Sequence, residues 1–253
     1  GMLNLAGVLL FAERPEWIKP QFIVKAIRYP GNAIHVTTYL DSEDFSGSLR
    51  AIFDGAMGFV MRNLRKIQAG QGVNAPGTPE IPPSVFEELL VNALAHRDYL
   101  ISAPIRLFIF DNRIEIISPG HLPNNLTVAK ILAGNSNIRN PILVSYIAKG
   151  LLPYRGLGSG IKRVLEEWPE VDFTDDRDGC LFIATVHRKE IVGSEKSSEK
   201  ILVLLKADPE LTARNIADAL GITQRAVEKQ ISKLREEGRI RRIGPDKGGH
   251  WEV

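Results

Sequence analysis

The segment Pro82–Tyr99 constrains the fold most, because it places polar side chains at helical spacing within a largely apolar run. Val85 and Leu89 recur four residues apart, which predicts a helix packed on a core. Glu88 and Asn92 are also four apart, so they lie on one face of that helix, one turn from each other. A carboxylate and a carboxamide rarely occupy such a helix unless they are exposed or have a functional role.

The two ends of this predicted helix carry further signals. Ser84 is a candidate N-cap, and Glu87, three residues on, is its capping-box partner. His96 and Asp98 add an imidazole and a second carboxylate near the other end. The segment therefore predicts a core helix that also carries a functional site.

Composition limits the class of protein. The 253 residues suggest one large or two small domains, and the hydrophobic fraction of 44% is enough to fill real cores. A net charge of +2 gives no bulk attraction for nucleic acid, so any DNA-binding surface must be local. The single cysteine, Cys180, excludes a disulfide within the chain, and its apolar neighbours predict a buried side chain. Because no signal peptide or bilayer-spanning apolar run is visible, we expect a cytoplasmic protein without a membrane partner.

The remaining patterns before residue 190 alternate between strands and helices. The segments expected are a short buried strand or helix at 5–11, strands at 21–28 and 33–39, a helix within 44–67, a Gly/Pro-rich connector at 68–83, a hairpin at 105–118, two short helices within 127–150 and a last strand at 180–187. Pro141 suits the first turn of the second short helix. This order predicts an α+β domain.

Three glycines at alternate positions, Gly156, Gly158 and Gly160, precede another helical pattern. Glycines let the backbone approach an anion, and the helix start that follows presents free N–H groups. No Gly-x-x-x-x-Gly-Lys-Ser/Thr occurs in the sequence, so the P-loop motor of a helicase is absent. The spacing does not fit a dinucleotide-binding fingerprint either.

Glu88-x-x-x-Asn92 resembles the N-box of the GHKL ATP-binding fold, and the longer signature with His-Arg-Asp-Tyr resembles RecG-related or Schlafen-AlbA-type transcriptional regulators. The resemblance implies ATP and Mg²⁺ as cofactors, with Asn92 as the metal ligand. It implies Glu88 as the base that activates water, where ATP is hydrolysed. It also implies that Gly156, Gly158 and Gly160 form the second glycine box.

The same resemblance implies further nucleotide contacts. Ser118 stands where the wider fold carries an adenine-reading Asp, and Gly120 is the retained glycine of that motif. A hydroxyl there lacks the charge assistance of a carboxylate. His96 and Asp98 join the site, and Arg139 belongs to a polar loop at 135–140 that is the candidate lid over the phosphates. Two alternatives stay open: Pro119-Gly120 is simply a turn, and Arg139 is a structural ion pair.

A polar linker at about 193–198 precedes a second pattern. Helices are expected at 201–205, at 211–220 ended by Gly221 and at 224–237 capped by Thr223, with short strands at 240–243 and 250–253. This order resembles a winged helix-turn-helix domain over nearly all of 198–253. The residues expected at double-stranded DNA are Gln224, Arg225, Glu228 and Lys229 near base edges, Lys233, Arg241 and Lys247 near phosphates, and the capping residue Thr223. The alternative is a dimerisation or protein-docking module.

Together with the α+β pattern, these resemblances imply a GHKL-like α/β sandwich with a mixed sheet, followed by a winged helix. The expected domains are 1–79, leading from an upstream AlbA-type module into the fold, 80–190 as the nucleotide-binding core, and 191–253 for DNA. The predicted function is a DNA-binding transcriptional regulator with an ATP-binding domain, and a homo-oligomer is expected. The alternatives are an ATPase of the same build using Glu88, and a degenerate scaffold for dimerisation that binds no nucleotide.

Overall fold

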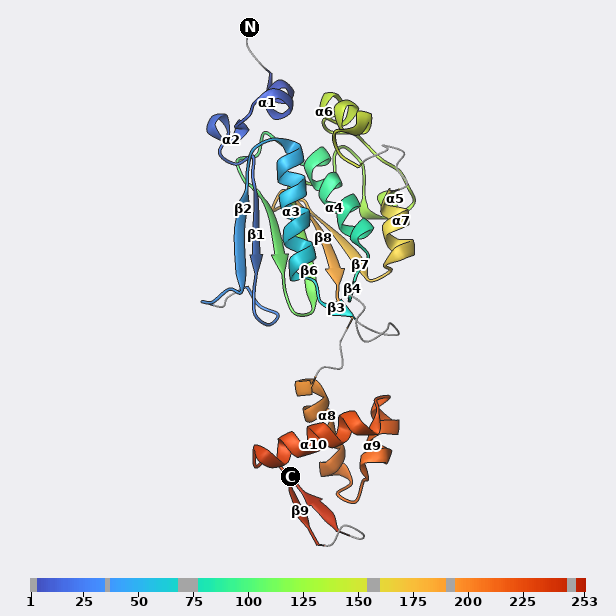
Figure 1. The fold of residues 1–253 in the computed structure, drawn as a ribbon. Helices are drawn as coiled ribbons and strands as arrows, with labels where there is room; N and C mark the ends of the chain where they lie inside the picture. Colours follow the sequence, from blue (N-terminus) through green and yellow to red (C-terminus); the bar gives the residue numbers. More distant parts are fainter. Residues whose placement is uncertain (1–3, 35–36, 68–76, 154–159, 190–193, 245–248) are drawn as a thin grey trace. The chain divides into compact units, whose positions relative to one another are not determined.

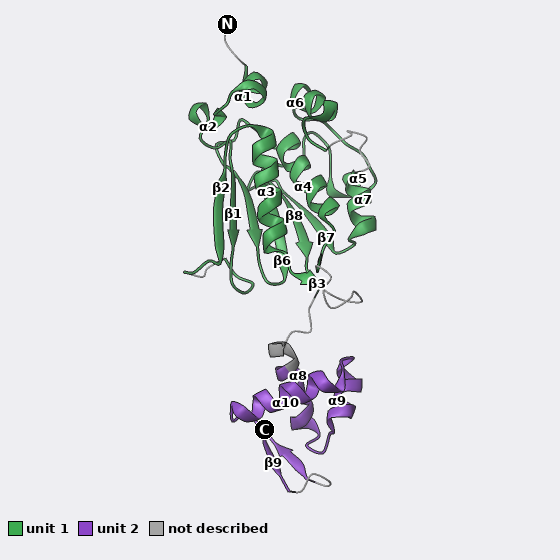
Figure 2. Cartoon of the chain, viewed as in Figure 1, with its two compact units in different colours: residues 1–189 green, residues 190–253 purple. Residues whose placement is uncertain are grey.

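The computed structural model describes residues 4–34, 37–67, 77–153, 160–189, 194–244 and 249–253, without the side chains of 194–197. The chain forms two compact units, residues 1–189 and 190–253 (Figure 2). The division expected at residue 79 lies inside the first unit. Among the described residues, no helix combines the length and apolar character needed to cross a membrane.

One six-stranded mixed sheet organises the first unit, as α+β patterns predicted. Its strands are β1 (Val24–Arg28), β2 (Asp41–Phe45), β5 (Ile105–Ile109), β6 (Arg113–Pro119), β7 (Val171–Asp176) and β8 (Leu181–His187), in the order β2-β1-β5-β6-β8-β7. β1 and β5 are parallel, and the other neighbours are antiparallel. A separate small ladder joins β3 (Lys66–Ile67) to β4 (Thr78–Pro79).

The predicted hairpin at 105–118 is confirmed, but the strand expected at 33–39 is wrong. Its place in the sheet is taken by β2, which begins at Asp41. β2 is an edge strand with exposed Ser42, Glu43 and Asp44, so it has no apolar alternation to reveal it. Arg62 donates to both Asp41 and Glu43, which ties this charged edge to the neighbouring helix.

Helices α3 (Leu49–Asn63) and α4 (Pro83–His96) lie side by side across one face of the sheet (Figure 1). The further helices of this unit are α1 (Leu5–Phe11), α2 (Pro15–Ile18), α5 (Val128–Leu132), α6 (Pro141–Tyr146), the π-helix η1 (Ile147–Leu151) and α7 (Gly160–Glu167). α4 buries eight side chains, among them Phe86 and Leu90, so the predicted core helix is confirmed. Pro141 occupies the first turn of α6, as predicted.

The ends of α4 differ from the sequence prediction. Its N-cap is Pro82, without a side-chain capping bond, whereas Ser84 lies inside the helix and donates its hydroxyl to Glu167. The Ser84 cap is therefore wrong, because a proline at the first helical position already supplies the start. At the other end, the buried Arg97 guanidinium donates to the carbonyls of Gln21 and Ala103, which fixes where α4 stops.

Cys180 is exposed, so its predicted burial is wrong. The residue closes the turn between β7 and β8 with a φ of 51°, and the apolar run that suggested burial begins only at Leu181. The Cys180 carbonyl accepts a 2.6 Å hydrogen bond from the Gly120 N–H, which joins this turn to the end of β6.

The second unit has the predicted winged-helix order. Its elements are α8 (Ser194–Ala207), α9 (Ala213–Leu220), α10 (Gln224–Glu236), β9 (Arg241–Ile243) and β10 (His250–Glu252). Gly221 ends α9 in the left-handed region at φ 64°, and Thr223 caps α10, as predicted. α8 begins within the segment expected to be linker. Ile201, Leu205, Ile216, Val227 and Leu234 are fully buried and fill the core.

Candidate functional site

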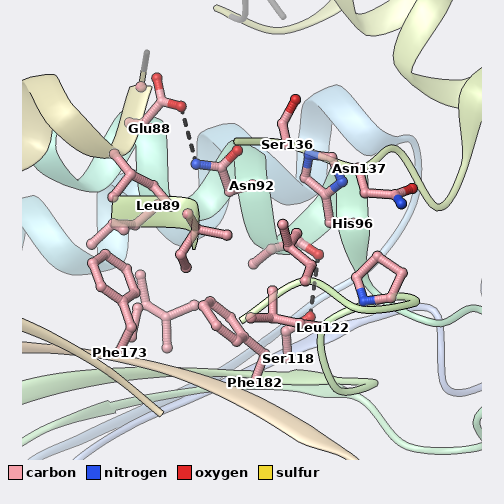
Figure 3. A pocket seen from close by; sticks show the side chains of 18 of the residues that line it. Glu88, Leu89, Asn92, His96, Ser118, Leu122, Ser136, Asn137, Phe173 and Phe182 are labelled. Carbon is pink, nitrogen blue, oxygen red and sulfur yellow. Dashed lines mark hydrogen bonds between the residues drawn. The ribbon is translucent and has the colours of Figure 1, made fainter. Parts of the chain in front are cut away.

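A pocket opens between α4, the loop after β6, the start of α7 and the sheet (Figure 3). The empty space among its lining residues is about 1030 Å³, counted together with the open solvent at its mouth. Its sheet side is apolar, and its α4 side is polar. The main apolar lining residues are Leu89, Ile116, Leu122, Phe173, Phe182 and Ala184, and the main polar ones are Glu88, Asn92, His96, Asn135, Ser136, Asn137 and Arg163.

The Glu88 and Asn92 side chains meet at the polar end. Asn92 Nδ2 donates to Glu88 Oε1 at 3.0 Å, and Arg163 Nη2 donates to Glu88 Oε2 at 3.2 Å. Only 13% of the Glu88 side chain is exposed, against 53% for Arg163. Because the Asn92 amide donates to Glu88, its carbonyl oxygen is the atom suited to a hard cation.

Gly160, the first residue of α7, packs directly against Glu88. A Cβ at this position would overlap with Oε1 and Cδ of Glu88, and even Oε2 would lie only 2.6 Å away. A side chain here would require the Glu88 carboxylate to shift. The structure thus places the third predicted glycine against Glu88, while Gly156 and Gly158 lie outside the described residues.

Two further predicted residues line the pocket. His96 is largely buried, and burial together with the nearby Arg139 charge lowers its pKa to about 4, so the imidazole is neutral at pH 7. The buried Ser118 hydroxyl donates to the Ala93 carbonyl at 3.4 Å. Both can therefore offer only neutral hydrogen-bonding groups to a ligand.

Gly120 also lines the pocket and has a φ of 101°, a conformation that favours glycine. A Cβ there would lie 2.7 Å from Asp98 Cβ, so the close packing needs glycine as well.

Asp98 and Arg139 lie outside the pocket lining. Arg139 Nη1 donates to Asp98 Oδ2 at 2.6 Å, and Nη2 donates to the His121 carbonyl. The pair joins the polar loop to the end of α4, and Asn140 adds bonds to the Ala95 and Arg97 carbonyls. This geometry fits the structural ion pair that the sequence left open. The predicted phosphate contact would require Arg139 to leave Asp98.

Phe173 and Phe182 were not singled out from the sequence. Their rings stack at 5.9 Å with an interplanar angle of 18°, and they form the aromatic wall of the pocket. Val171 and Phe173 alternate along β7, which is the signal that could have placed Phe173 on an inward face. Arg163 was also missed, because its role depends on the contact between α4 and α7.

In the second unit, the predicted DNA-contact residues lie on the outer face of α10 and on the first wing strand. Gln224, Arg225, Glu228, Lys229, Lys233 and Arg241 are exposed, and Lys247 lies outside the described residues. Thr223 accepts the Ala226 N–H as the helix cap. Lys233 forms an exposed 3.7 Å ion pair with Glu237, so its charge is partly offset.

Residues 102–177 match the family model "Putative ATP-dependent DNA helicase recG C-terminal", and residues 195–241 match "Winged helix-turn-helix DNA-binding". The chain joins a RecG-C-terminal-like ATPase domain to a winged helix-turn-helix domain. The predicted architecture is therefore confirmed. The first match contains Ser118 and the three glycines but begins after α4, so it does not reach Glu88 and Asn92.

One solved structure with the same fold is the DIP2311 protein from Corynebacterium diphtheriae. It is 22% identical, with a TM-score of 0.60 over 100% of this chain and 54% of that chain. The present chain thus spans about half the length of that protein. No curated protein matches the sequence.

Proposed function

We propose that the chain is a DNA-binding transcriptional regulator whose first unit binds a Mg²⁺-nucleotide. The observation that carries the proposal is the contact of Gly160 with the Glu88–Asn92 pair at the polar end of a pocket whose other wall is aromatic. This arrangement offers one surface for a planar base and another for a phosphate chain.

The lining fits a nucleotide better than a free anion. The wall made by Phe173 and Phe182, with Leu122 and Ile131 also in the lining, suits the flat, largely apolar surface of a purine. At the polar end, the Arg163 charge is already paired with Glu88. A triphosphate at this end therefore needs Mg²⁺ to offset its charge.

The metal would be shared between protein and ligand. Among the described residues, no group of three or more His, Cys, Asp or Glu side chains could hold a metal ion. Mg²⁺ commonly takes one or two protein oxygens together with phosphate oxygens and water, and the Asn92 carbonyl oxygen can supply one of these. We therefore expect Mg²⁺ and nucleotide to bind together.

ATP hydrolysis is a second candidate, and the position of Glu88 favours it. Its carboxylate lies one turn from Asn92, at hydrogen-bond distance from the amide, where it can orient a water toward the phosphate that Mg²⁺ holds. Each carboxylate oxygen accepts one bond, Oε1 from Asn92 and Oε2 from Arg163. Each oxygen keeps a second lone pair, so Glu88 can accept a proton from water while both bonds are in place.

The second unit supports DNA as the partner. The winged-helix match and the exposed cations Arg225 and Lys229 at the start of α10 fit a helix that enters a major groove. A nucleotide in the first unit regulates DNA binding only if it binds one state of the protein more tightly than another. The proposal therefore requires measurable coupling between the two ligands.

Fluorescence anisotropy of the full chain on a labelled random-sequence duplex tests the proposal. We expect salt-sensitive binding whose affinity changes when Mg²⁺ and ATP are added. Asn92→Ala should remove the nucleotide effect and keep DNA binding, whereas Asn112→Ala, an exposed asparagine in the β5–β6 turn, should keep both. If no duplex binds at low salt, the winged helix is a protein-docking module and the regulator proposal is wrong.

A further inference from the structure

The outer face of the first two turns of α10 contains one acidic side chain among cations. Gln224, Arg225, Glu228 and Lys229 are all exposed, while Val227 is fully buried and sets the inward face. A carboxylate on a surface that approaches phosphates weakens binding to every DNA sequence. We therefore expect Glu228, beside Arg225 and Lys229, to make a contact with DNA that offsets this repulsion.

The orientation of Glu228 is set by a neutral neighbour. Gln224 Nε2 donates to Glu228 Oε1 at 2.8 Å, one turn earlier on the same face. Within the part of the second unit that the structure describes, no ion pair joins Glu228 to Arg225 or Lys229. The carboxylate thus accepts a bond from an amide on one oxygen, no ion pair with a described residue offsets its charge, and Oε2 remains to accept another bond.

The major groove offers few partners for such an oxygen. Cytosine presents an N4 amino donor and no acceptor, adenine presents its N6 amino donor beside the N7 acceptor, and guanine and thymine present acceptors that repel a carboxylate. Cytosine is therefore the base that suits a carboxylate best. We propose that Glu228, positioned by Gln224, is a specificity-determining residue that selects a cytosine in the DNA site. This inference rests on the proposed DNA-binding function and adds a base preference to it.

The preference can be measured with matched charge changes on one helix. Duplexes are selected from a random library with the wild-type full chain, and affinities are then measured by anisotropy on the selected duplex and on single-base variants. Glu228→Gln and Glu236→Gln each remove one exposed negative charge from α10, but Glu236 lies in the last turn. Only the first change weakens the proposed base contact, because it replaces a charged acceptor with a neutral amide.

We expect the selected duplex to contain one cytosine whose replacement weakens wild-type binding about tenfold. Glu228→Gln should reduce this penalty to less than about threefold and tighten binding to random duplex. Glu236→Gln should retain the full penalty. Gln224→Ala should reduce the penalty partly, since Gln224 orients the carboxylate, and should leave the unfolding midpoint unchanged, since its side chain is exposed.

The proposal is wrong if Glu228→Gln and Glu236→Gln leave the same base preferences, or if the wild-type chain selects no cytosine. Either result with intact DNA binding refutes the role of Glu228 alone. A wild-type chain that binds no duplex refutes the proposed function itself, so the two failures are distinguishable.

Discussion

Gly160→Ala tests whether the α7 start and the N-box form one site. The added methyl group would overlap with the Glu88 carboxylate, which cannot simply swing aside because Asn92 and Arg163 hold it and only 13% of its side chain is exposed. Either the carboxylate leaves both partners or α7 shifts away from α4. Both outcomes disrupt the polar end of the pocket.

The cost follows from two opposing effects. Overpacking at a tight site typically lowers the free energy of unfolding by about 1–3 kcal/mol. Alanine is preferred over glycine in a helix by up to about 1 kcal/mol, but this preference is weaker at the first helical position. We therefore expect a net loss of about 1–2 kcal/mol in the first unit, together with loss of nucleotide binding.

Urea denaturation of the full chain measures this loss, and Trp168, buried one residue after α7, reports on the first unit. The matched control is Gly58→Ala in α3, where a Cβ meets open space, so it should stabilise by about 0.4–1 kcal/mol. In a Glu88→Ala background the cost of Gly160→Ala should largely vanish. An equal cost in both backgrounds would refute the contact.

Three further predictions concern single side chains. The folded pKa of His96, about 4, lies below its ordinary 6.5, so unfolding takes up a proton between these values. The His96 contribution to the free energy of unfolding is fully present above about pH 6.5 and falls toward pH 4 by at most about 3 kcal/mol. His96→Asn should flatten this part of a titration of the urea midpoint against pH. Arg188 and Glu80 form a nearly fully buried ion pair, so Arg188→Ala should lower the free energy of unfolding, measured with urea, by about 3–5 kcal/mol. Arg50→Ala, at an exposed pair in α3, should lower it by less than about 0.5 kcal/mol. Equal losses would contradict the assigned burial. If the chain hydrolyses ATP, Glu88→Gln should stop phosphate release and spare binding, and unchanged turnover would remove Glu88 from the mechanism.

The second unit could be predicted almost completely because its signals are local. Gly221 and Thr223 mark a helix end and a helix start within three residues, and both have the expected roles. The first unit depended more on distant contacts. β2 is a charged edge strand whose pairing with β1 cannot be seen in its own residues. The Ser84 cap failed because Pro83 already begins the helix, and the Ser84 hydroxyl instead donates to Glu167, 83 residues away.

The candidate site was predictable on one helix and less so elsewhere. The spacing of Glu88 and Asn92 places them on one helix face, and the structure brings them within hydrogen-bond distance. The aromatic wall was not predictable, because Phe173 and Phe182 come from two strands that meet only in the folded sheet. Arg139 shows the same limit: a polar loop indicated a phosphate contact, but its nearest anion is Asp98.

Calorimetric titration of ATP into the full chain, with and without Mg²⁺, tests the central claim most directly. We expect saturable binding that requires Mg²⁺ and that Asn92→Ala abolishes without lowering the urea midpoint, while Asn112→Ala binds as the wild type does. Wild-type protein that binds no ATP or ADP at millimolar concentration with Mg²⁺ would contradict the claim, and the first unit would then be a scaffold without a nucleotide.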